Sequence, residues 1–159
     1  MRESDSVADS DSFWSHATTV WEHAAARQRL LHWQDDYDVD VILALFALWY
    51  PHPLAAADWD ALAREARDWN IAATRRIRSL RRRLKHTAPP ELYRSMLQLE
   101  LTAERTAALR LLNRARALPR PERSDNSSPN PAVRLAHLFP DLPQTEIRAA
   151  LRELAPPTP

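Results

Sequence analysis

The chain has 159 residues and a formal net charge of +1, and it contains neither Cys nor Gly. Its length fits one domain, and the lack of Cys excludes disulfides, thiolate nucleophiles and Cys-based zinc sites. The lack of Gly removes the positive-φ backbone of tight hairpins and phosphate-binding loops, which excludes P-loops and dinucleotide-binding fingerprints. With thirteen prolines that punctuate the chain, these absences predict an all-α fold.

In chain order, the sequence predicts a disordered beginning, five main helices and a short helical end. Residues 1–11 are mostly Ser, Asp and Glu and have almost nothing to bury. Apolar residues at helical spacing then predict main helices over 12–23, 25–36, 39–50, 54–86 and 90–117. These helices would form a single bundle domain over 12–118, followed by a Pro-rich linker over 119–131, a short helical segment over 132–155 and a tail over 156–159.

The segment 39–50 is predicted to be the buried central helix of the bundle. Its residues are apolar on every side, which is typical of a helix enclosed by others. Asp38 or Asp40 can cap its beginning, and Pro51 ends it. At about twelve residues it is too short to cross a bilayer, which takes about 20.

Helices 54–86 and 90–117 are predicted to form a long antiparallel hairpin, because only a short Pro-containing turn separates them. The first helix carries one narrow apolar stripe with heptad-like spacing from Trp59 to Leu84. The residues of the second helix that we expect to face inward are Leu92, Met96, Leu99, Leu101, Ala108, Leu109 and Leu112.

Charge is unevenly divided along the chain. Residues 1–60 carry eleven acids and three bases, giving −8, whereas residues 61–123 carry sixteen bases and six acids, giving +10. The two regions can therefore pair with each other or with a partner of opposite charge. No basic start with an apolar stretch marks a signal peptide at residues 1–12, and no apolar run reaches the roughly 18–20 residues that span a bilayer. We expect a cytoplasmic protein that is not inserted in a membrane.

Three segments carry a resemblance to a known family: LHWQDDYDVDVILALFALW at 31–49, Trp69 with IRSLRRRLK at 77–85, and ELTAE at 100–104. They resemble a small bacterial family of uncharacterised helical proteins, domain of unknown function 2390. The resemblance covers roughly residues 13–112 and implies an all-helical fold in a bacterial cytoplasm, without implying an activity. This chain has Asp38 where the family usually has Gly, and Ile42 where it usually has Asn.

A candidate polar site consists of Gln34, Asp35 and Asp40, which surround the turn into the predicted central helix. One interpretation is structural: such side chains cap the helix, bond the turn backbone or pair with an Arg of the long helix. The other is a ligand site. Asp36, Asp38 and Asp40 also have the first spacings of a calcium loop, but the later Gly and Glu of that loop are absent. The six His residues have no metal-binding spacing either, so we predict neither a metal nor a cofactor.

A second candidate site is basic. Arg75, Arg78, Arg82 and Lys85 share one helical face by their spacing, and such a row could bind a partner or the phosphates of a nucleic acid. The alternative is a solvated face neutralised by the acidic first sixty residues. No aromatic residues interleave the run for base stacking.

Six Trp residues fall on predicted apolar faces, where they could form the core or line a ligand pocket. No catalytic motif accompanies them. The sequence therefore favours a non-enzymatic protein that binds an unidentified protein partner or itself. RNA or nucleoprotein binding through 75–85 is the first alternative. The second is a ligand-binding protein or enzyme that uses Gln34, Asp35 and the arginines around a Trp-lined pocket.

Overall fold

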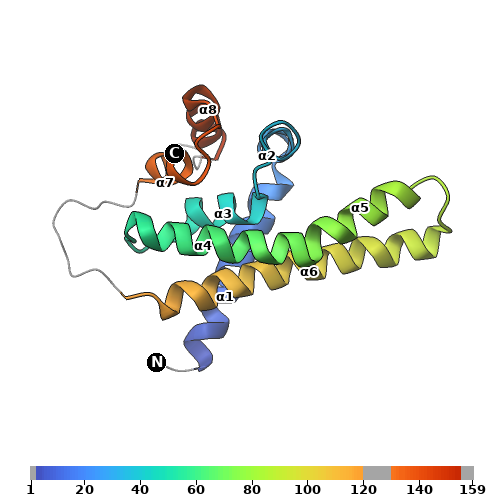
Figure 1. The fold of residues 1–159 in the computed structure, drawn as a ribbon, viewed down its shortest axis with the longest axis horizontal. Helices are drawn as coiled ribbons and strands as arrows, with labels where there is room; N and C mark the ends of the chain where they lie inside the picture. The colour runs from blue at the N-terminus through green and yellow to red at the C-terminus, as the bar shows by residue number, and fades with distance from the viewer. Residues whose placement is uncertain (1–2, 120–129, 155–159) are drawn as a thin grey trace.

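The computed structural model describes residues 3–119 and 130–154, and the described residues form helices, turns and loops with no strand (Figure 1). The all-α bundle predicted from the sequence is confirmed. Its helices are α1 (Glu3–Glu22), α2 (Ala24–Tyr37), α3 (Val41–Trp49), α4 (Ala56–Trp69), η1 (Asn70–Thr74), α5 (Arg75–Leu84), α6 (Pro90–Ala117), α7 (Pro131–Leu138) and α8 (Gln144–Leu154). No helix in this part of the chain combines the length and the apolar character that crossing a membrane requires.

Helix α3 is the core of the bundle. Leu43, Ala44, Leu45, Phe46 and Ala47 are all buried, as its apolar sequence predicts. Helices α1, α2, α4, α6 and α7 all pack against it. The Asp40 side chain accepts a hydrogen bond from the Leu43 backbone N–H at 3.1 Å, so of the two predicted caps it is Asp40 that begins this helix.

The long hairpin is present, but its first helix is not uniform. The expected helix 54–86 consists of α4, a π-helical turn (η1) and α5, which together make one continuous rod beside α6 (Figure 1). Sequence periodicity does not reveal the π turn, because every residue of NIAAT fits an α-helix pattern as well.

Two expectations about the helices were wrong. Helix α1 begins at Glu3, so residues 3–11 continue the helix where we expected disorder. No Pro or Gly interrupts this stretch, and Asp9 pairs with Arg116 of α6 at 3.3 Å, which ties the stretch to the bundle.

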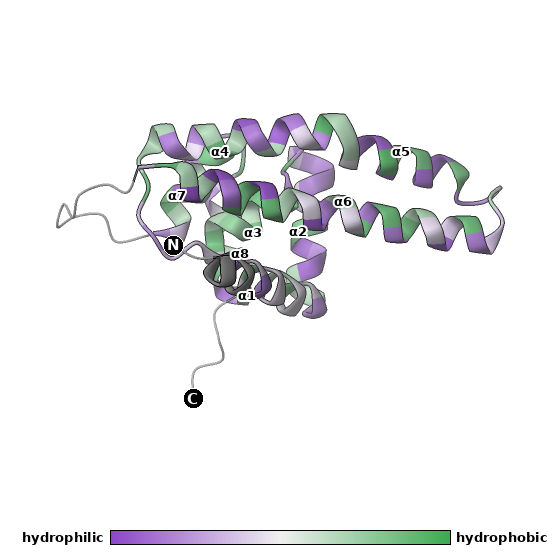
Figure 2. Ribbon diagram, turned by 90° about the horizontal axis from the view of Figure 1, so that it is seen from below, coloured by the Kyte–Doolittle hydropathy of each residue, from purple (hydrophilic) through white to green (hydrophobic). Residues whose placement is uncertain are grey.

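The inward face of α6 also differs from the prediction. Met96, Ala108 and Leu112 are buried as expected, whereas Leu92, Leu99, Leu101 and Leu109 are exposed. The buried face instead follows Met96, Glu100, Ala103, Ala107, Leu111 and Ala115, where small side chains let the rod approach closely. The α5–α6 end of the hairpin extends beyond the other helices and carries both hydrophilic and hydrophobic residues (Figure 2).

The C-terminal helices α7 and α8 dock on the bundle. Leu135 and Ile147 are completely buried in the common core. Arg29 of α2 pairs with Glu146 and Glu153 of α8, each at 2.7 Å, and the Trp33 indole N–H donates to Glu146 at 2.9 Å. The predicted linker and tail fall largely on 120–129 and 155–159, outside the described residues.

Candidate functional site

A cavity of about 500 Å³ lies between the α2–α3 turn, the α4–α5 rod and α6. We call it the arginine cavity, because its walls include Arg75, Arg78, Arg82 and Arg83. It unites the two sets of residues singled out in the sequence, since the predicted site residues that line it are Gln34, Asp35, Asp40, Arg75, Arg78 and Arg82. Lys85 is exposed on the same helix face but does not line the cavity.

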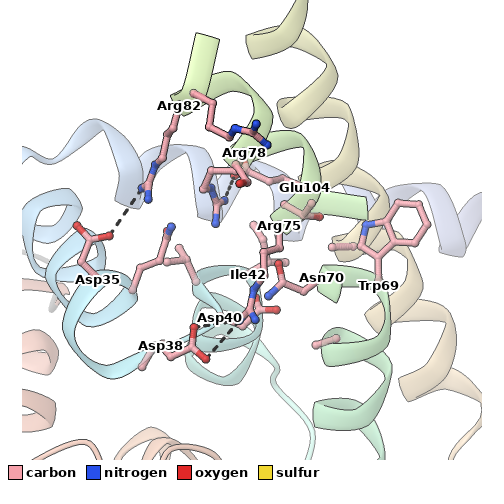
Figure 3. A pocket seen from close by; sticks show the side chains of 18 residues that line it. Asp35, Asp38, Asp40, Ile42, Trp69, Asn70, Arg75, Arg78, Arg82 and Glu104 are labelled. Carbon is pink, nitrogen blue, oxygen red and sulfur yellow. Dashed lines mark hydrogen bonds and ion pairs between the residues drawn. The ribbon is translucent and has the colours of Figure 1, made fainter. Parts of the chain in front are cut away.

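The α2–α3 turn presents its acids to the cavity through an unusual backbone conformation. Asp38 has φ 52° and ψ 35°, a left-handed conformation, and its N–H donates to the Trp33 carbonyl to close α2. Such a conformation favours Gly, and Asp is among the few other residues that adopt it as single residues. In this chain the Asp38 carboxylate accepts a hydrogen bond from Arg75 at 3.0 Å (Figure 3).

Asp40 both caps α3 and lines the cavity. Burial raises the pKa of its carboxyl, although the backbone N–H groups of α3 and the charges of Arg78 and Arg75 oppose this shift. The capping interpretation of Asp40 is therefore correct, and it does not exclude a second role toward the cavity. Within the described part of the chain, no three His, Asp or Glu side chains gather as a ligand set for a metal ion.

Glu104 of α6 is the fourth carboxyl group of the cavity wall, after Asp35, Asp38 and Asp40. It accepts a hydrogen bond from Arg78 at 3.0 Å (Figure 3). Arg78 also donates to Glu100 at 2.7 Å. Burial raises the pKa of Glu104, and the neighbouring charges of Glu100 and Asp40 add to this effect. The cavity thus contains two carboxyl groups, on different helices, that hold their protons to higher pH than usual. Groups with such raised pKa values are frequent at functional sites.

Glu100 behaves differently from Glu104, because two arginines bind it. Burial alone would raise its pKa, but hydrogen bonds from Arg81 and Arg78 hold the pKa of Glu100 below its ordinary value. Arg78 is accordingly part of a buried ion network and is not free to face solvent.

The π turn η1 forms another part of the wall. Asn70 and Thr74, the first and last residues of this turn, both line the cavity. The Thr74 side chain is only 6% exposed, and its hydroxyl has no hydrogen-bond partner within the described structure. An unpaired buried hydroxyl is costly and calls for an explanation, and π turns are frequent at functional sites. Sequence reasoning missed both residues, and the Asn and Thr within an otherwise helix-forming run were the only signal.

The remaining arginines of the cavity have weaker partners. Arg75 and Asp38 are exposed, as are Arg82 and Asp35, whose charged atoms lie 3.7 Å apart. Arg83 forms no ion pair with any residue that the structure describes. Asp35 therefore reaches an Arg of the long helix, one of the options that its position in the sequence left open.

The Trp residues serve several purposes. Trp33 and Trp59 are buried in the core, whereas Trp69 lines the arginine cavity and donates its indole N–H to the Ala103 carbonyl at 2.9 Å. Trp14 and Trp21 border a separate hollow, and Trp21 is exposed. Some of the Trp residues thus belong to the core and others line a cavity, so each of the two interpretations drawn from the sequence applies to part of the set.

Comparison with known proteins places most of this structure in one family. The family model described as "Protein of unknown function (DUF2390)" matches residues 12–111, which include every residue of the arginine cavity. This match confirms the resemblance seen in the sequence. No curated protein and no solved structure matches the chain.

Proposed function

This chain belongs to the DUF2390 family, and we propose that it binds a small phosphate- or carboxylate-bearing ligand in the arginine cavity. The observation that carries the proposal is the set of three arginines, Arg75, Arg82 and Arg83, on the wall of an open cavity without a buried partner. A guanidinium group presents forked donors that match the two oxygens of a carboxylate or phosphate.

The existing partners of these arginines are easily displaced. The side chains of Arg75 and Asp38 are 54% and 84% exposed, and those of Arg82 and Asp35 are 55% and 58% exposed. Ion pairs this exposed contribute little to stability. A ligand anion can therefore replace the carboxylates of Asp35 and Asp38 at a small cost in free energy. Arg83 can bind the anion without first breaking an ion pair to a described residue.

The interior of the cavity supports an anion as well. Thr74 and Ser79 bring hydroxyl groups to its wall, and Asn70 brings an amide. The Thr74 hydroxyl gains in such a complex the hydrogen-bond partner that it lacks in the free protein. Because the pKa values of Asp40 and Glu104 are raised, these two carboxyl groups repel an anion less than ordinary carboxylates do.

The two other functions weighed from the sequence receive less support. Arg78 is half-buried and paired with Glu100 and Glu104, so it interrupts the basic row as a continuous track for nucleic-acid phosphates. Arg75 and Arg82 pair instead with Asp38 and Asp35 at the edge of a cavity (Figure 3). The acidic and basic regions of the chain pair with each other in these contacts, which weakens the argument for an external protein partner. A protein partner, nucleic-acid binding and the bacterial cytoplasmic setting stay predictions.

The test is a titration of the full-length protein with methyl phosphate, followed by calorimetry and by the melting temperature. We expect binding by the wild type and its loss in the double variant Arg82→Ala/Arg83→Ala. The matched control is Arg76→Ala/Lys85→Ala, which removes the same charge from α5 and its C-cap residue at positions outside the cavity.

Comparison of these two double variants distinguishes binding in the arginine cavity from general electrostatic attraction of phosphate to the basic helix. If both double variants lose binding equally, the helix attracts phosphate through its net charge and the proposed cavity site is wrong. If the wild type does not bind methyl phosphate at low salt, the proposal is also wrong. If a parallel titration shows that the protein binds RNA and that both double variants weaken this binding equally, the nucleic-acid alternative is favoured.

A further inference from the structure

A second, smaller hollow of about 180 Å³ lies between α1, α3 and α6. We call it the tryptophan cavity, because Trp14 and Trp21 line it. Its other apolar lining includes Ala17, Ile42, Leu45 and Leu101. Trp21 and Leu101 are 38% and 45% exposed, so large apolar side chains border an open hollow and are not closed over by the fold.

The two cavities adjoin each other. Gln34, Val41, Ile42 and Glu104 line both of them. The shared residues come from the α2–α3 region on one side and from α6 on the other. A cationic cavity and an apolar cavity thus share part of their walls, and the apolar side chain of Ile42 lines both.

We infer that the ligand is an anionic amphiphile with a single chain, whose charged group lies in the arginine cavity and whose apolar chain crosses Ile42 into the tryptophan cavity. This inference rests on the proposed function, and it adds the chemical class of the ligand. The occupant follows from charge and from the shared wall: an anionic head can pair with Arg82 and Arg83, and an apolar chain attached to it can reach the apolar cavity past the shared residues Val41 and Ile42.

Two polar side chains of the tryptophan cavity already have partners, while Glu22 and Gln34 also line it. The Thr18 hydroxyl is already committed to the Trp14 carbonyl at 2.8 Å. Glu104 is engaged by Arg78. An apolar hollow of roughly 150 Å³ holds a benzene molecule in other proteins, so this one takes a chain of about six carbons.

The experiment measures the affinity of the full-length protein for methyl, butyl and hexyl phosphate by calorimetry. For the wild type we expect affinity to rise with chain length by up to roughly fourfold for each methylene that is buried. The variant Leu101→Gln should lose this dependence and still bind methyl phosphate as the wild type does. Leu97→Gln is the matched control, since Leu97 is 40% exposed on the same helix but does not line the cavity.

Each outcome decides between the two proposals. If methyl phosphate binds and chain length has no effect, the anion site stands and the amphiphile inference is wrong. If the chain-length dependence persists in Leu101→Gln, and also in Trp21→Ala, the chain does not occupy the tryptophan cavity. If hexyl phosphate binds but binding does not need Arg82 and Arg83, both the inference and the proposed function fail.

Discussion

Arg134 of α7 donates a hydrogen bond from its guanidinium to the backbone carbonyl of Tyr50, 2.6 Å away, at the end of α3. The same group donates to the carbonyls of Ala47 at 3.1 Å and His52 at 2.9 Å, and it stacks 4.9 Å from the Trp59 ring. The last carbonyls of a helix lack partners within that helix. An arginine distant in sequence therefore closes the central helix and fixes the C-terminal segment to the core.

We expect Arg134→Met to reduce the free energy of unfolding by about 3 kcal/mol, because three backbone acceptors, in one buried and two partly buried contacts, lose a charged donor. Urea denaturation measures this loss, and hydrogen exchange should show increased opening of α7 and α8. The exposed residue Arg148 on α8 provides the control, since Arg148→Met should change stability by no more than about 0.5 kcal/mol. An effect as small as the control's would show that Arg134 does not hold the segment.

Arg78→Met should also destabilise the protein, by about 2 kcal/mol, because Glu104 loses its cation while it stays partly buried. The matched variant is Arg76→Met, on the same helix and exposed, for which we expect a change within about 0.5 kcal/mol. The denaturant midpoints of the two variants measure this difference in stability. Equal midpoints would mean that the Arg78 network contributes no more than a surface charge does.

The left-handed backbone at Asp38 predicts a difference between two small substitutions. Asp38→Gly and Asp38→Ala both remove the exposed pair with Arg75, but only Gly adopts φ 52° without a steric penalty. The Gly variant should therefore be more stable than the Ala variant by about 1 kcal/mol, or about 2–4 °C in melting temperature. Equal melting temperatures would argue against the left-handed conformation in solution.

The raised pKa of Asp40 makes stability depend on pH. A carboxyl group whose pKa is higher in the folded protein adds stability below its unfolded pKa of 3.8, and that contribution is lost as pH rises through the folded value. Asp40→Asn keeps a good N-cap side chain but cannot ionise. The melting temperature of this variant, relative to wild type, should thus increase from about pH 4 to about pH 7.

Other carboxyl groups do not disturb this comparison. Glu100, Glu146 and Glu153 have lowered pKa values, so they stabilise the protein above about pH 4.5, but they do so in both proteins. Arg75 and Arg78 face Asp40 and keep their charge in both proteins. The charge of Asp40 contributes to the raised pKa of Glu104, so its removal makes Glu104 lose less stability as pH rises, which adds to the expected trend. A difference in melting temperature that is constant or that falls with rising pH would contradict the raised pKa.

Some of the site could be predicted from the sequence. The acids around the α2–α3 turn and the arginines of α5 can be identified as candidates in the sequence, because they are concentrated in short segments. Asp40 caps α3, as its position in the sequence predicts. Thr74 and Glu104 could not be identified in the same way. A helical Thr and a Glu beside arginines are ordinary in sequence, and only burial and the lack of a partner distinguish Thr74.

The sequence by itself determined most of the helices, but not the start of α1 or the π turn η1. The absence of Gly, the apolar spacing and the prolines gave α6 its predicted bounds and made α3 the central helix. Only the tertiary structure decided which face of α6 is buried. Apolar residues occur on more than one face of this helix, and packing against the neighbouring helices determines which of these faces is buried. It also decided that Gln34, Asp40 and Arg78 share a cavity, because contacts between distant segments depend on how helices pack and not on their spacing along the chain.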